Sequence, residues 1–233
     1  MARTESTVKR AVAEVLTRPR RFFEREDRFE SALAPLLVVL SLAVVSLLSL
    51  LPAYLSLLAS RPLPGFGPFV LAFGGTAVRT SRLSATVVFG IVAAPFLVWA
   101  LHGAALHLLA RPFASGGSLR RTLVVTGWGY LPQVGATAVT LLATVAIAVS
   151  SPDAAPSAFG VTLAGHAAVR GKQLTPLYVG AELVGIAGTL WSGYVWYGGL
   201  RAVSGLSRRQ AALVVGGLVF VLVDTTVLGR LLG

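Results

Sequence analysis

The chain has 233 residues, of which 55% are hydrophobic and 12% are charged, and its mean hydropathy is +0.78. Soluble domains carry about 25% charged residues, so this composition excludes an ordinary water-soluble protein. The formal net charge is +11 and the chain contains no cysteine, which excludes disulfides, thiolate metal sites and cysteine nucleophiles.

Residues 1–32 form a charged tail in front of the first long apolar stretch. Apolar residues in this tail recur at i, i+3, i+4, i+7 and i+8, which is the spacing of a helix with one apolar face. The pattern predicts a short amphipathic helix over about 7–17 that ends at Pro19. Such a helix lies either on the cytoplasmic leaflet of a membrane or against the protein's own inner loops. The residues of the stripe are Val8, Ala11, Val12, Val15 and Leu16.

Five long apolar stretches follow the tail. Each is long enough to cross a bilayer core, which takes about 20 helical residues. Lipid cannot hydrogen-bond the backbone, so stretches of this length without strand-like alternation are expected to be helical. The sequence therefore predicts an all-α integral membrane bundle of five transmembrane helices, with the amphipathic helix as a cytosolic tail. Within the transmembrane domain, 33–232, the predicted spans are about 33–59, 84–110, 122–150, 176–199 and 210–232.

Three of the predicted spans contain an internal proline, and the connections between the spans are of two kinds. Pro52, Pro95 and Pro132 fall inside predicted spans, where each removes one backbone hydrogen bond and favours a kink or a break. The connections 60–83 and 151–175 are long and rich in glycine and proline. The connections after the second and fourth spans are short and basic.

The basic residues are divided unevenly between the two sides of this topology. Eight of the 20 precede the first span and three lie in each short connection, so fourteen share one side and six lie on the other. Lys and Arg are retained in the cytoplasm during insertion, so we expect a multi-pass protein of the cell membrane with its N-terminus in the cytosol and its C-terminus outside. The same residues are expected to contact anionic lipid at the cytoplasmic face. No nucleic-acid role is expected.

The third and fourth stretches carry two further patterns. Small residues at i, i+4, i+7 and i+11 share one helix face, which another helix can approach closely within the bundle or in a homo-oligomer. Aromatic residues gather toward the inner ends, where an aromatic belt at the membrane interface is expected. The small residues are Ala181, Gly185, Gly188 and Ser192, and the aromatic residues are Trp128, Tyr130, Trp191, Tyr194, Trp196 and Tyr197.

Glu182 and Asp224 are the acidic residues within the predicted spans. Both lie at similar depth near the outer end of their span. An ionised side chain in lipid is costly, so such groups usually turn inward, pair or take up a proton. We expect both to face the protein interior or an outward-facing wet crevice.

Two histidines lie toward the inner end of the second span. His102 and His107 are five residues apart, which separates them by about 140° around a helix, unlike the i, i+4 pair of a zinc-protease helix. They are poor joint metal ligands. One of them is expected to hydrogen-bond across the bundle, to Gln133 or to the backbone freed by Pro132.

Several segments, taken in order along the chain, resemble one protein family. The tail carries LTRPRRFF at 16–23, and HGAALHLL at 102–109 is followed by SLRRT at 118–122 and GYLP at 129–132. The fourth stretch ends in WSGYVWYGGL at 191–200, and GLSRRQA follows at 205–211. In order and spacing the chain resembles the Yip-type domain family of five-pass membrane proteins, in particular its prokaryotic branch, across about 16–230.

The resemblance implies five helices and a cytosolic N-terminus. Eukaryotic members of this family bind Rab-type GTPases and vesicle machinery, but they carry a long cytosolic domain where this chain has a short tail. Rab binding is therefore not expected here. Prokaryotic members have no settled activity.

Two classes of function agree with these features. The first is a non-enzymatic membrane scaffold that binds lipid, a membrane-protein partner or a second copy through its tail and inner loops. The scaffold agrees with the family resemblance and with the lack of GxSxG, Walker and HExxH motifs. For the same reason no metal or cofactor is expected. The alternative is a small transporter or channel in which Glu182 and Asp224 line a wet cavity.

Overall fold

The computed structural model describes residues 2–29, 31–48, 69–73, 76–80, 85–114, 116–150 and 176–231. Within this part of the chain the predicted helical class is confirmed, and a two-stranded hairpin that the sequence did not predict is added to it. In chain order the elements are α1 (Ala2–Thr17), α2 (Pro19–Phe23), the 3-10 helix η1 (Glu26–Phe29), α3 (Leu33–Leu48), β1 (Phe69–Phe73), β2 (Thr76–Thr80), α5 (Ala85–Ala110), α6 (Leu119–Gly129), α7 (Leu131–Ser150), α9 (Pro176–Ser204) and α10 (Arg208–Leu231).

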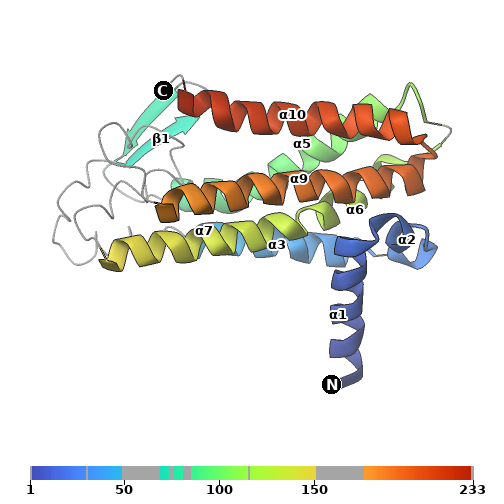
Figure 1. Cartoon of the computed structure of the whole chain (residues 1–233), viewed down its shortest axis with the longest axis horizontal. Coiled ribbons are helices and arrows are strands. Elements are labelled where there is room, and N and C mark those ends of the chain that lie inside the picture. The colour runs from blue at the N-terminus through green and yellow to red at the C-terminus, as the bar shows by residue number, and fades with distance from the viewer. Residues whose placement is uncertain are drawn as a thin grey trace.

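The long helices form one bundle (Figure 1). α3, α7, α9 and α10 run along the long axis of the molecule, and α5 slants across it. The tail, the start of α3 and the α9–α10 connection lie at one end, which we call the tail end. The antiparallel hairpin of β1 and β2, in which Phe69 pairs with Thr80 and Phe73 with Thr76, lies toward the opposite end with the C-terminus.

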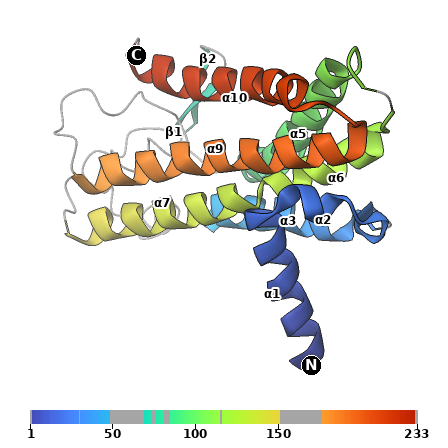
Figure 2. The same ribbon diagram turned by 45° about the vertical axis from the view of Figure 1, so that its right-hand side comes forward.

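The N-terminal helix runs crosswise to the bundle and projects away from it in both views (Figures 1 and 2). α1 is longer than the predicted 7–17 helix and ends at Thr17. Its second half is docked, because Ala11 and Val15 are buried while Lys9 and Arg10 are exposed. For this half of the helix, the alternative of packing on the protein itself is therefore correct.

The third predicted span is two helices. α6 ends at Gly129 and α7 begins at Leu131, with Tyr130 between them. Pro132 stands two residues after this break, and it has no N–H with which to continue the ladder back into α6. Pro95, in contrast, lies inside α5 without ending it. Pro52 and residues 49–59 of the first predicted span lie outside the described residues.

The tight connection from α9 to α10 follows from its sequence. α9 continues to Ser204, beyond the predicted end at 199, and Gly205 then adopts φ +65, a left-handed conformation that glycine reaches without strain. Ser207 and Gln210 form a capping box, in which each side chain accepts a hydrogen bond from the other residue's backbone N–H at 3.3 and 2.9 Å. These two signals fix where α10 begins.

The buried core and the exposed apolar surface lie on the same helices. The largest fully buried side chains gather where α2, α5, α6 and α9 meet, and include Trp196, Phe22, Leu106 and Leu200. Large apolar side chains are nevertheless exposed on every bundle helix. Examples are Leu37 on α3, Leu101 on α5, Leu142 on α7, Leu190 on α9 and Leu213 on α10. Soluble monomers rarely expose extensive apolar surface.

By length and hydropathy, one helical segment among the described residues can cross a membrane. It is Val92–Ala110, with a mean hydropathy of 1.7, and 11% of its residues are buried in the molecule. The low buried fraction is unlike the core helix of a soluble protein. α3 is apolar, but its 16 described residues are shorter than a span.

Candidate functional site

The tail docks on α9 because two adjacent glycines leave room for it. A Cβ on Gly198 would stand 2.8 Å from Cγ of Pro19, and one on Gly199 would stand 2.3 Å from Cγ1 of Val125 on α6. The missing side chains thus let α2 and α6 both approach α9. The ring of Phe22, three residues after Pro19, is buried in the core. It packs edge to face against Trp128, with 5.1 Å between the ring centroids.

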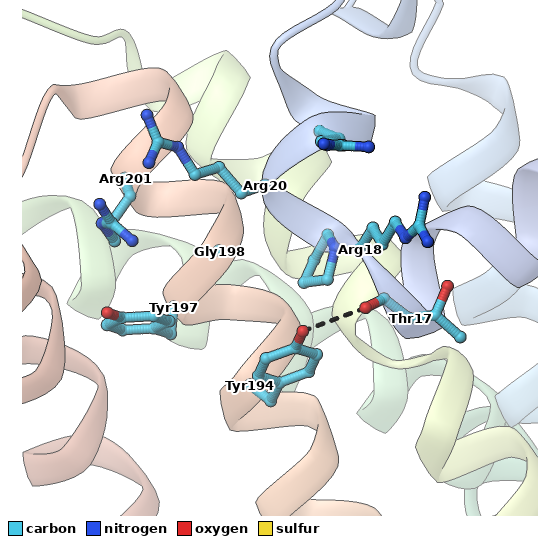
Figure 3. A pocket seen from close by; sticks show the side chains of 9 residues that line it. Thr17, Arg18, Arg20, Tyr194, Tyr197, Gly198 and Arg201 are labelled. Carbon is cyan, nitrogen blue, oxygen red and sulfur yellow. Dashed lines mark hydrogen bonds between the residues drawn. The ribbon is translucent and has the colours of Figure 1, made fainter.

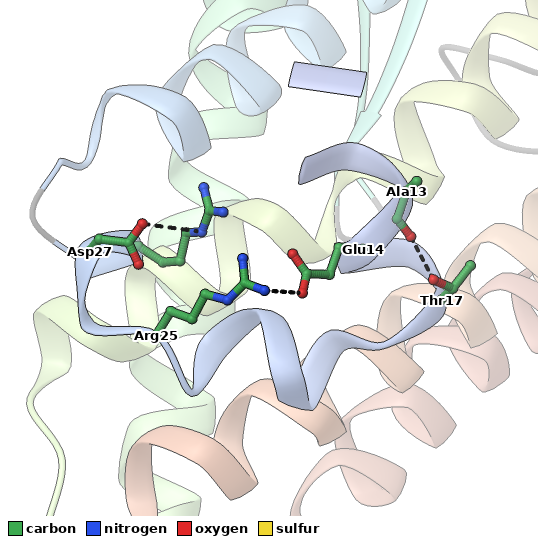
Figure 4. Close-up of polar contacts among 6 residues, drawn as sticks. Ala13, Glu14, Thr17, Arg25 and Asp27 are labelled. Carbon is green, nitrogen blue, oxygen red and sulfur yellow. Dashed lines mark hydrogen bonds and ion pairs between the residues drawn. The ribbon is translucent and has the colours of Figure 1, made fainter. Parts of the chain in front are cut away.

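Hydrogen bonds and ion pairs hold the tail in this position. Indole Nε1 of Trp191 donates to the carbonyl of Leu16 at 3.0 Å, and the hydroxyl of Tyr194 donates to the carbonyl of Thr17 at 3.1 Å. These are carbonyls at the end of α1, which have no partner within the helix. Ion pairs join the tail to itself and to α6: Arg25 with Glu14 at 3.0 Å (Figure 4), and Arg121 with Glu26 at 2.6 Å.

A buried aromatic cluster lies deeper in the bundle. His102 of α5 hydrogen-bonds through Nδ1 to the hydroxyl of Tyr130, and the two rings stack with 6.0 Å between centroids. Trp196 contacts both rings edge-on and donates to the carbonyl of Thr126 at 3.2 Å. The cluster thereby joins α5, α9 and the break between α6 and α7.

This cluster corrects the predicted aromatic belt. Trp128, Tyr130 and Trp196 are buried in the core, whereas Trp191 and Tyr194 are about half exposed and bond the tail. An apolar ring suits a protein core as well as a membrane interface, so the sequence could not separate the two environments.

A basic pocket of about 480 Å³ lies where the tail meets the end of α9 (Figure 3). Its charged lining residues are all arginines, and in Figure 3 the side chain of Arg20 extends toward Arg201 whereas Arg18 points the other way. The guanidinium of Arg201 lies 5.5 Å from the ring centroid of Tyr197. The full lining is Thr17, Arg18, Pro19, Arg20, Arg21, Tyr194, Tyr197, Gly198 and Arg201.

The tail segment 16–23 and the α9 segment 191–200, which meet here, are two of the segments that carry the family resemblance. A comparison of the whole chain with known families tests whether the chain belongs to that family. A family model for the Yip1 domain matches residues 13–227. The chain belongs to the Yip1 domain family. An uncharacterized protein of the archaeon Methanocaldococcus jannaschii is 32% identical over 130 residues, which cover 55% of this chain and 84% of that protein. No solved structure matches. Yip1 domains are membrane-associated, in agreement with the apolar helices.

Three of the polar residues predicted within the Yip1 domain have described side chains, and these three have separate partners. His102 bonds across the bundle, but its partner is Tyr130; Gln133 instead donates to the hydroxyl of Thr189 at 2.8 Å. His107 stands 3.5 Å through Nδ1 from the hydroxyl of Thr122. Among the described residues, no group of three histidines or acids could hold a metal ion. Glu182 and Asp224 belong to α9 and α10, but their side chains lie outside the described residues.

The predicted small-residue face of α9 meets α7 at Gly188. A Cβ on Gly188 would stand 2.7 Å from Cβ of Ala136, so α7 approaches most closely there. Ser192 is fully buried and donates to the carbonyl of Gly188 at 2.9 Å, and Ala181 is buried as well. Gly185 has no atom within 4 Å of its Cβ position. Part of the face thus packs inside the Yip1 domain.

Sequence reasoning missed the basic pocket. On α9 its residues Tyr194, Tyr197 and Arg201 stand at i, i+3 and i+7, a spacing that does indicate one helix face. The arginines 18, 20 and 21 come from the tail, more than 170 residues away in the chain. No spacing rule connects the two segments.

Proposed function

We propose that this Yip1 domain crosses the cell membrane five times, with its tail end in the cytosol and its C-terminus outside. The main support is the exposed apolar surface on every bundle helix, which lipid would cover. The tail and the C-terminus lie at opposite ends of the bundle (Figure 1), as an odd number of spans requires. The excess of basic residues in the tail and the two short connections gives the orientation.

Reporter fusions test this topology. An enzyme active only outside the cytosol should be active when fused after Gly233 and inactive when inserted at Gly116, in the α5–α6 connection. A reporter active only in the cytosol should give the reverse pattern at both sites. Cytosolic activity after Gly233 would contradict the odd number of spans.

Within that topology, the protein is a non-enzymatic scaffold that binds lipid and membrane-protein partners at its cytosolic end. The observation that carries this function is the docked tail. The tail is charged and is fixed onto the bundle, so it forms a rigid surface that we call the platform. The contacts that fix it are buried Phe22, the hydrogen bonds of Trp191 and Tyr194, and the Arg121–Glu26 ion pair. A fixed platform loses little conformational entropy when a partner binds, so it is suited to recognition. The transport alternative depends on Glu182 and Asp224, whose side chains lie outside the described residues.

Site-specific photocrosslinking in the native membrane tests the scaffold. A photoreactive residue at exposed Ala13 on the tail should form a discrete adduct with a partner protein or with a second copy of this chain. At Leu213, which is 71% exposed on α10, it should form adducts with lipid only. Equal protein adducts at the two positions would indicate random collision, and the absence of any protein adduct at Ala13 would contradict partner binding at the tail.

A further inference from the structure

The arginines of the basic pocket at the end of α9 form none of the described hydrogen bonds and ion pairs that join the tail to the bundle. The four arginines line one cavity of about 480 Å³, within the usual range of small-ligand sites, and none of the described acidic residues lines it. Arg20 is paired with Glu24 at 2.8 Å on the same helix turn. In the described part of the structure no ion pair is formed by Arg18, Arg21 or Arg201. The pocket therefore concentrates positive charge that the protein itself does not neutralise.

Arg201 gives this charge a fixed position. Its Nε is buried and has no hydrogen-bond partner among the described residues. A buried donor on a charged group is costly when it is unpaired, so an acceptor that reaches this guanidinium would stabilise the site. The ring of Tyr197 holds the guanidinium in place from one side.

The chemistry of the lining selects an oxyanion. A guanidinium presents a planar fork of N–H donors that matches the oxygens of a phosphate, and several arginines around one cavity are typical of phosphate recognition. Among the described residues, the lining contributes arginine donors and tyrosine rings but no carboxylate. A phosphate group between Arg201 and Arg20, whose side chain extends toward Arg201 (Figure 3), would receive hydrogen bonds from α9 and from the tail at once.

The position of the pocket along α9 indicates where such a phosphate comes from. Leu183, Leu190, Tyr194 and Arg201 are spaced by seven, four and seven residues, so they form one stripe along the helix. The stripe changes from exposed leucines to a half-exposed tyrosine and then to the arginine of the pocket. Apolar, aromatic and basic residues in this order follow the hydrocarbon core, the interface and the headgroup level of a bilayer.

We propose that this pocket binds a phosphate group, supplied by the headgroup of an anionic phospholipid of the cytosolic leaflet. The assignment of the lipid rests on the five-span topology proposed above. The phosphate site itself rests only on the geometry of the pocket. The tail arginines and Arg201 come from different segments, so a bound headgroup also clamps the tail onto α9.

Lipid binding by the purified full chain tests the proposal. Native mass spectrometry would count dioctanoyl phosphatidylglycerol bound to the parent, to Arg201→Gln and to Arg209→Gln. Arg209 is an exposed arginine at the start of α10 and outside the pocket, so it controls for loss of one positive charge. We expect about tenfold weaker binding for Arg201→Gln, as for loss of one charged hydrogen-bonding group, and less than about twofold for Arg209→Gln. Equal losses in the two variants would mean diffuse attraction and would overturn the site.

Two further arms complete the test. In the first arm, inorganic phosphate competes with the lipid. If it displaces phosphatidylglycerol and binds the parent as tightly as the lipid does, the phosphate site is supported but its ligand is a soluble phosphate. In the second arm, binding of dioctanoyl phosphatidylcholine as tight as that of phosphatidylglycerol would overturn selection of an anionic headgroup. If Arg201→Gln does not fold, Arg21→Gln removes one charge from an exposed arginine of the pocket lining and is compared with Arg209→Gln in the same way. If the parent binds both lipids equally but still forms protein adducts at Ala13, the phosphate site is rejected and the proposed scaffold function still stands.

Discussion

Replacement of Phe22 by Ala should release the tail from the bundle. The Phe22 ring is fully buried and packs edge-on against Phe23 and Trp128, with the guanidinium of Arg28 4.8 Å from its centre. Truncation of a buried phenylalanine costs about 3 kcal/mol or more. Because α2 holds the end of α1 on α9, most of this loss should appear as local opening. Hydrogen exchange should then accelerate about a hundredfold in the amides of α1 and α2.

Phe113→Ala is the matched control, because Phe113 is 46% exposed in the α5–α6 connection. It removes the same kind of side chain where about half of it is exposed and where it forms none of the described contacts between the tail and the bundle, and exchange in the tail should stay at the level of the parent. Similar acceleration in the two variants would contradict the docked tail. Acceleration spread over all helices for Phe22→Ala would mean that the tail and the bundle unfold together.

The second large effect is expected for Gly129→Ala, which should destabilise the whole bundle. A Cβ at Gly129 would stand 1.9 Å from Nε1 and 2.2 Å from Cδ1 of Trp196, closer than atoms can approach. Trp196 is 1% exposed and is confined by its bond to Thr126 and by the rings of His102 and Tyr130. Overpacking of this kind costs about 1–3 kcal/mol. The midpoint of thermal unfolding in lipid nanodiscs should fall clearly.

Gly135→Ala makes the same substitution on α7, where no atom lies within 4 Å of the added methyl group. Alanine favours a helix over glycine by about 1 kcal/mol, so this variant should be as stable as the parent or more so. The two substitutions are therefore expected to shift the midpoint in opposite directions. Equal shifts would show that Trp196 can move, and that the cluster does not restrain the break between α6 and α7.

The tail shows how far local sequence reasoning reaches. The spacing of its apolar residues predicted a helix ending before Pro19, because helix periodicity and the steric effect of proline act within a few residues. The spacing could not decide whether the apolar stripe meets lipid or protein. That depends on Gly198 and Gly199, whose missing side chains admit Pro19 and Phe23 against α9.

The histidines and the aromatic residues show the same limit within the bundle. Helix geometry correctly separated His102 from His107, because five residues always place two side chains on different faces. The partner of His102 was not predictable, since Tyr130 reaches it only because the chain breaks between α6 and α7. Trp196 was predicted at an interface and is buried in the core.

The sequence by itself determined the helical class, the membrane association and the family, because each depends on composition, on long apolar runs or on ordered motifs along the chain. The tertiary structure decided which face of each helix is buried, where the tail docks and how arginines from two distant segments come to line one pocket. Lipid and protein core are both apolar, so a bundle helix such as α5 carries apolar residues all around and its sequence does not mark the inner face. Close packing at small residues selects that face, and the basic pocket forms as a consequence of this packing.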